Sequence, residues 1–241
     1  MANPEHLNQL SAGQWNEWRT ANPTLSPDLI DAKLAGLDLR GINFSKAHLR
    51  GADFTGAQLD GADLSRSILE GARLTNASLT EAKIESVQLD FLDLTDLDLS
   101  GAFLHRSTLR GTNLTRTNLR HADLSQTQME SALFDEADLS GAKLQGTSLR
   151  GGRFDRAVLR GVQGASAILD GVELESLSME GRSSPMPRPT THKSRTVVCI
   201  GRTFAVRHCE MPTFTGQSCV RRSLTRPSAR EPASATQTSK K

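Results

Sequence analysis

Large aromatic residues are scarce in this 241-residue chain, which has no Tyr, two Trp and eight Phe. An irregular core in a globular domain usually contains more of these large side chains. Leu and Ala dominate the apolar residues instead. This composition favours many small, similar layers over one irregular core.

Cysteines and long apolar runs are also scarce. The three Cys stand at positions 199, 209 and 219, and their odd number argues against a disulfide framework. No window of 18 apolar residues exists, so we expect no transmembrane span. The polar start, Met1 to Glu5, lacks the apolar segment of a signal peptide. We therefore predict a cytoplasmic protein without membrane contact.

The charge is divided unevenly along the chain. Residues 1–181 contain 17 Lys and Arg against 25 Asp and Glu, whereas residues 182–241 contain 12 against 2. An acidic body is thus followed by a strongly basic tail. Such an asymmetry suggests separate partners or self-association.

A five-residue repeat fills residues 32–181. Of the thirty positions five apart from Leu34 to Met179, 22 are Leu, four are Phe, two are Met and one is Ile; Gly164 alone is not a large apolar residue. A small residue, most often Ala, stands two positions before each centre, Asp or Asn often stands between them, and Gly often follows two positions later. The consensus is Ala-Asp-Leu-x-Gly.

A period of five fits neither an α-helix nor a flat strand, whose periods are 3.6 and 2. A chain that turns a corner every five residues satisfies it. The small and the large residue of each pentad then point inward, and Gly and polar residues occupy the corners.

This pattern resembles the pentapeptide repeat family. The resemblance implies an all-β solenoid, a right-handed quadrilateral β-helix with four pentads in each coil. Residues 32–181 would then form about seven to eight coils, roughly 36 Å long at the usual strand spacing. Grouping by twenty places one set of centres on a common inner face: Leu34, Phe54, Leu74, Leu94, Leu114, Phe134, Phe154 and Leu174. Charged outer positions twenty apart would pair across coils.

Residues 1–31 are predicted to form an N-terminal cap. One amphipathic helix over residues 5–20 would gather Leu7, Leu10, Trp15 and Trp18 in a stripe that closes the first coil over Leu34. The segment also resembles the leader W-N-x-W-R-x-x-N-P that precedes some bacterial pentapeptide arrays. Stacking of a ligand between the two Trp is the alternative.

Residues 182–241 are predicted to form a basic, low-complexity and largely disordered tail. Further coils are disfavoured because Arg202, Arg207 and Arg222 occupy the inward position. A tail arising from a shifted reading frame is a second explanation. The last coil has no convincing cap, so residues 197–204 or another copy, in a homodimer, would cover it.

No pattern indicates catalysis. The His and Cys residues lack the spacing of a zinc site, and no Gly-Lys-Ser/Thr phosphate loop occurs. The neighbours His208 and Cys209 are only a weak indication of metal or redox chemistry. Acidic pairs such as Asp96 and Asp98 have no cleft on a convex rod. We expect a non-enzyme with no metal or cofactor.

Three functions remain open. The first is a scaffold that binds a protein partner on its outer faces. The second is suggested by the family resemblance, since some members inhibit DNA gyrase and protect it from quinolones by mimicking a DNA duplex. Its candidate surface is acidic: Glu81, Glu85, Asp90, Asp93, Asp96 and Asp98. The third is binding of nucleic acid or another polyanion by residues 182–241.

Overall fold

The computed structural model describes residues 1–164, 166–169 and 172. All of them belong to one compact unit, Met1–Cys209. The predicted core residue Leu174, the last predicted pentads and the basic tail over 182–241 lie outside the described residues.

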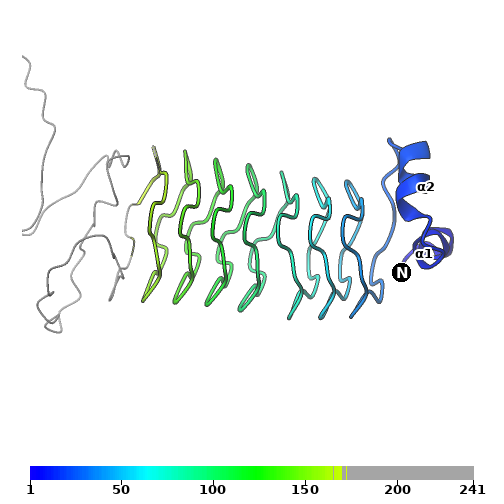
Figure 1. The fold of residues 1–241 in the computed structure, drawn as a ribbon, viewed down its shortest axis with the longest axis horizontal. Helices are drawn as coiled ribbons and strands as arrows, with labels where there is room; N and C mark the ends of the chain where they lie inside the picture. The colour runs from blue at the N-terminus through cyan, green and yellow to red at the C-terminus, as the bar shows by residue number, and fades with distance from the viewer. Residues whose placement is uncertain (165, 170–171, 173–241) are drawn as a thin grey trace, which may run out of the picture. The chain divides into compact units, whose positions relative to one another are not determined.

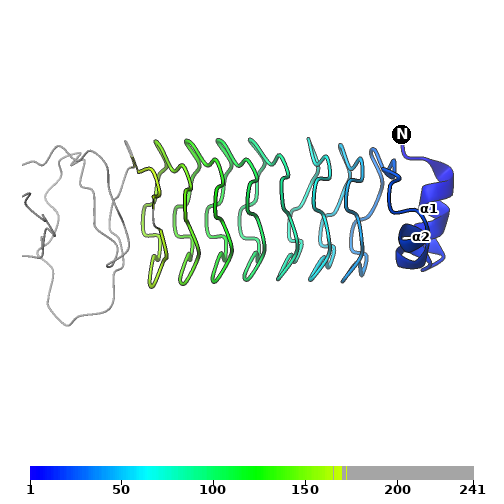
Figure 2. The ribbon, with the colours of Figure 1, turned by 90° about the horizontal axis from the view of Figure 1, so that it is seen from above.

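The chain winds into a stack of coils that each contain twenty residues (Figures 1 and 2). Parallel bridges join every fifth residue to the residue twenty positions later, from Asp28 with His48 to Ser148 with Ile168, except between Arg73 and Asp93. Backbone hydrogen bonds run between neighbouring coils, such as Leu34 N to Asp53 O at 2.9 Å. Each coil therefore contains four pentads.

The coil register begins earlier than predicted. The sequence predicted a cap that ends at residue 31 and an array that begins at Ala32, but Asp28 already bridges to His48. Leu29 is fully buried as the centre of this extra pentad, and Pro27 fills its small inward position. The proline ring is small enough for the inward position, but it differs from the consensus Ala, so the pentad is hard to detect in the sequence.

Each corner requires the left-handed backbone conformation. From Asp31 to Ser166, the residue two positions after every centre has a positive φ, between 56° and 72°. Glycine adopts this conformation without steric strain, which explains the Gly of the consensus. Other residues at this position, including Phe91 at φ 62°, carry the strain of the turn.

An Asp or Asn that stands directly before a centre stabilises the turn that follows it. The Oδ1 atom of Asp53 accepts hydrogen bonds from the Thr55 backbone N–H at 3.1 Å and from the Thr55 hydroxyl at 2.6 Å. Asn113 and Thr115 repeat the arrangement at 3.1 and 2.7 Å. A short polar side chain thus satisfies a turn amide that has no backbone partner within its own coil.

The centres fill the interior of the coils. Of the core residues predicted on one face, seven are described and buried: Leu34, Phe54, Leu74, Leu94, Leu114, Phe134 and Phe154. The Phe134 and Phe154 rings stack with centroids 4.4 Å apart, whereas Phe54 meets Phe44, which comes from another face, at 6.1 Å. At three of the described positions where Thr replaces the inward Ala, Thr112, Thr117 and Thr147, the buried hydroxyl donates to a carbonyl of the preceding coil, as Thr117 does to Leu94 O at 2.8 Å.

The N-terminal segment contains two helices instead of the predicted single helix over 5–20. Helix α1 spans Pro4–Ser11 and helix α2 spans Trp15–Ala21. Gly13 separates them at φ 69°, a conformation that ends helices. Trp15 is buried at 2 % exposure, and Leu7, Leu10 and Trp18 pack half-buried against the core.

Polar side chains of α2 complete the first coil. The Trp15 indole donates to Asn43 O at 2.7 Å. The Asn16 amide accepts from Asn43 N at 2.8 Å and donates to Gly41 O at 3.1 Å. Arg19 donates to the carbonyls of Leu25 at 2.7 Å and Ser45 at 3.0 Å. These bonds replace those that a preceding coil would supply.

One seam interrupts the regular bonding between coils. Among the described residues, the amides of Leu69, Gly71, Leu74 and Asn76 form no backbone hydrogen bond with the next coil. One coil earlier, the equivalent Leu49 and Gly51 amides bond across at 2.9 Å. An apolar void lies between the same coils, lined by Leu64, Leu69, Leu74, Leu79, Ile84, Leu89, Leu94 and Leu99. The stack is therefore least tightly bonded here.

Candidate interaction surface

The six acidic residues predicted as a DNA-mimicking surface are not gathered on one face. Glu81, Glu85, Asp90, Asp93, Asp96 and Asp98 lie within one twenty-residue coil. Residues so spaced along one coil are distributed around its circumference. Two of them also lie beside cationic or titratable side chains, since Glu85 is 3.4 Å from the His105 imidazole and Asp96 is 2.6 Å from Arg116. The sequence prediction of an acidic patch was therefore wrong.

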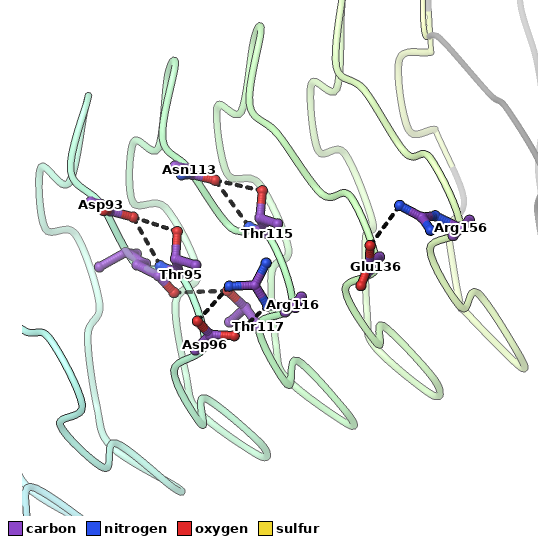
Figure 3. A network of polar contacts seen from close by, with 10 residues as sticks. Asp93, Thr95, Asp96, Asn113, Thr115, Arg116, Thr117, Glu136 and Arg156 are labelled. Carbon is purple, nitrogen blue, oxygen red and sulfur yellow. Dashed lines mark hydrogen bonds and ion pairs between the residues drawn. The ribbon is translucent and has the colours of Figure 1, made fainter.

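A ladder of alternating charge follows one corner of the coils (Figure 3). It contains Asp96, Arg116, Glu136 and Arg156, each twenty residues from the next. Arg116 donates two hydrogen bonds of 2.6 Å to the Asp96 carboxylate, and Arg156 lies 2.6 Å from Glu136. The hydrogen bonds from Arg116 lower the pKa of Asp96. Positive and negative charges therefore alternate along this corner.

A second ladder follows the corner after the face that contains Leu49. Its described members are Arg50, Glu70, Asp90, Arg110, Glu130 and Arg150. Arg50 lies 3.6 Å from Glu70, and Arg110 lies 3.4 Å from Glu130. The predicted pairing of outer charges across coils is present in these pairs. Exposed pairs of this kind each contribute about 0.2–1 kcal/mol to stability.

Apolar side chains interrupt these charged surfaces at few places. Phe91 is the most exposed large aromatic residue among those described, at 80 %, followed by Phe103 at 41 %. The Phe91 ring lies over Gly111 in the next coil, where a Cβ atom would stand 2.7 Å from two ring carbons. Sequence reasoning missed Phe91, because corner positions were expected to contain Gly or polar residues.

The buried Arg19 and His6 have structural roles. Arg19 is 2 % exposed, and burial lowers its pKa. His6 Nδ1 accepts from Asp28 N at 3.0 Å, and its ring lies 5.1 Å from that of Trp18. Both residues therefore hold the helices on the first coil. The centroids of the Trp15 and Trp18 rings lie 5.1 Å apart, and the two rings pack against each other in this same contact between the helices and the first coil.

The described part of the chain contains no group of three His, Cys, Asp or Glu side chains placed to hold a metal ion. Among the described residues, no helix is long and apolar enough to cross a bilayer. The predicted pair His208 and Cys209 lies outside the described residues.

Comparison with known proteins gives a consistent result for the repeats. A family model described as pentapeptide repeats matches eight copies, over residues 28–66, 57–90, 88–126, 112–151 and 137–176. No curated protein sequence matches significantly.

Several solved structures are similar. The pentapeptide repeat protein Rfr23 of the cyanobacterium Cyanothece 51142 is 18 % identical with a TM-score of 0.35, over 39 % of this chain and 85 % of Rfr23. HetL of Nostoc, a protein involved in the regulation of heterocyst differentiation, is 28 % identical with a TM-score of 0.25, over 73 % of this chain and 96 % of HetL.

QnrB1, a plasmid-mediated fluoroquinolone resistance protein, is 20 % identical with a TM-score of 0.30, over 62 % of this chain and 90 % of QnrB1. The family model, which covers more than half of the chain, carries the assignment. Coils of four pentads and repeated matches to this model identify a right-handed β-helix solenoid, and the chain belongs to the pentapeptide repeat family.

Proposed function

We propose that the protein is a non-enzymatic scaffold that binds a protein partner on the outer faces of its coils. The observation that carries this proposal is the division between inside and outside. Leu, Phe and Ala fill the interior, whereas ladders that contain ion pairs between coils follow two of the corners. Such a surface offers many fixed contacts to another protein.

Affinity capture with the full chain tests this proposal. The variant R116E/R156E makes one ladder uniformly acidic, and R40E is a matched control, because Arg40 pairs locally with Asp38 at 2.6 Å and lies outside that ladder. A partner that uses the Asp96 ladder would be retained by the native chain and by R40E and lost by R116E/R156E. The purified partner should then bind the native chain directly. Failure of every captured protein to bind directly would contradict the proposal.

The charge pattern disfavours DNA mimicry as the alternative. A DNA duplex presents unbroken negative charge, whereas cations interrupt the negative charges of both ladders. The full chain should therefore leave gyrase supercoiling unchanged at micromolar concentration. Inhibition that persists in R40E and disappears in D96K would favour the mimic over the scaffold.

Polyanion binding by residues 182–241 rests on their charge alone. In the full chain, replacement of the Lys and Arg of this segment with Gln should abolish salt-sensitive retention of DNA. Equal retention by both proteins would exclude the tail as the binding segment.

A further inference from the structure

One edge of the solenoid contains a single large apolar side chain. This edge, here called the Phe91 edge, comprises the corner residues Asp31, Gly51, Gly71, Phe91, Gly111, Ser131 and Gly151 and the charged ladder from Arg50 to Arg150 directly before them. Phe91 is 80 % exposed and has a φ of 62°. An exposed aromatic residue in a strained backbone conformation is unfavourable for the isolated chain, which points to a contact that buries it.

The Phe91 ring is placed asymmetrically along this edge. It leans over Gly111, as the 2.7 Å approach to a Cβ built there shows, whereas a Cβ built on Gly71 meets no atom within 4 Å. The surface beside Gly71 is therefore uncovered. If a second copy lies alongside in the opposite direction, with the two Phe91 residues level, Gly71 of each copy stands level with Gly111 of the other. Each ring then leans toward the uncovered surface of its neighbour.

The charges of the same edge invert their sign about Asp90. One coil away on either side stand Glu70 and Arg110, and two coils away stand Arg50 and Glu130. The same antiparallel placement brings Glu70 level with the neighbour's Arg110 and Arg50 level with the neighbour's Glu130. A parallel placement would bring like charges together. The antiparallel direction therefore pairs opposite charges at four of the five levels and places like charges together only at Asp90, which faces its own copy, whereas the parallel direction places like charges together at all five.

We propose that the protein forms an antiparallel, two-fold symmetric dimer through the Phe91 edge. An isologous interface requires a self-complementary surface, and the apolar ring, the small corner residues and the inverted charges together provide one. Burial of two aromatic rings supplies the main driving force, and the charges fix the register. This pairing is independent of which other protein the scaffold binds.

Sedimentation equilibrium of the full chain tests the role of Phe91. The variant F91S should raise the dimer dissociation constant at least tenfold, because it removes the only large apolar group of the edge. F103S is the matched control, since Phe103 is also exposed but lies on another face, and it should change the constant less than twofold. A native chain that stays monomeric up to several hundred micromolar, or a dimer equally stable in F91S, would overturn the proposal.

Charge exchange tests the antiparallel register. E70R and R110E should each weaken the dimer several-fold, and the double variant E70R/R110E should restore it. A repaired folding defect cannot explain such a rescue. Within one chain, the double variant still places two cations side by side at positions 50 and 70 and two anions at positions 110 and 130, so it restores neither of these ion pairs. Circular dichroism confirms that each variant is folded. A double variant weaker than both single variants would rule out this register and point to another interface, such as the C-terminal coil or a foreign protein.

Discussion

Arg116 and Asp96 are twenty residues apart in sequence and adjacent across one coil boundary, joined by two hydrogen bonds of 2.6 Å. Both side chains are about half exposed. Their contact shows how the coil length converts a sequence interval into a neighbour on the surface. The pKa of Asp96 therefore reports directly whether adjacent coils are aligned with a twenty-residue offset.

The pKa of Asp96 should rise toward its ordinary value when Arg116 is replaced by Met. The hydrogen bonds from Arg116 favour the carboxylate, so the folded-state pKa lies below the unfolded one. The contribution of the pair is therefore present above the unfolded pKa and is lost as the pH falls through the folded one. Carboxyl ¹³C NMR measures the titration of Asp96 in the native chain and in R116M. As a control, R116M should leave Asp38 unchanged, since Arg40 lowers the pKa of that residue to about 2. An Asp96 curve unaltered by R116M would contradict the contact.

The substitution G111A should destabilise the protein more than G41A. Both glycines have positive φ, 59° and 64°, which costs an Ala about 1 kcal/mol. Only at Gly111 does the added Cβ also meet the Phe91 ring at 2.7 Å. Urea unfolding of the single variants and of F91S/G111A measures the difference. The extra cost of G111A should disappear in the double variant, and equal effects of G111A in both backgrounds would exclude the clash.

Replacement of Arg19 by Met should loosen the N-terminal cap. Arg19 is buried and donates to the carbonyls of Asn22, Leu25 and Ser45. Hydrogen bonds from a charged donor contribute about 1.5–3 kcal/mol each, and the carbonyls left behind would lose their partners. Hydrogen exchange should therefore accelerate over residues 3–45 and stay unchanged beyond residue 100. T20A, at an exposed position of the same helix, is the control and should leave these rates nearly unchanged.

Amides at the seam should exchange faster than their equivalents one coil earlier. Leu69, Gly71 and Leu74 lack backbone hydrogen bonds to the next coil, whereas Leu49, Gly51 and Phe54 have them. Native-state hydrogen exchange by NMR compares the two sets directly. Protection factors that are equal at both places would show that the seam is closed in solution.

Periodicity alone predicted the repeat family and the inward residues. Every centre of the five-residue repeat points inward, so Leu34 and Leu114 are buried whatever their neighbours are. The first pentad was missed because Pro27 departs from the consensus at its small position. The break at Gly13 was missed because a single glycine inside an amphipathic pattern does not by itself show where a helix ends.

The surface was less predictable than the core. Asn16 and Arg19 bind carbonyls and amides of Gly41, Asn43 and Ser45, and these contacts depend on how the helices lie on the first coil. The predicted acidic patch failed for a related reason. Glu85 and Asp96 are close in sequence but lie in pentads on different sides of the coil, whereas residues twenty apart are neighbours across a coil boundary.

The fixed turn at every fifth residue also limits how the length of this chain can change. One inserted residue would move every later Leu from the inside to the outside. Five inserted residues would preserve the inside but rotate all later faces by a quarter turn, so that Arg110 would no longer follow Asp90 along one corner. Only a gain or loss of twenty residues keeps the later Leu residues inside and the outer charges in their rows along the corners. The array can therefore lengthen or shorten in whole coils without losing its pattern of outer charges.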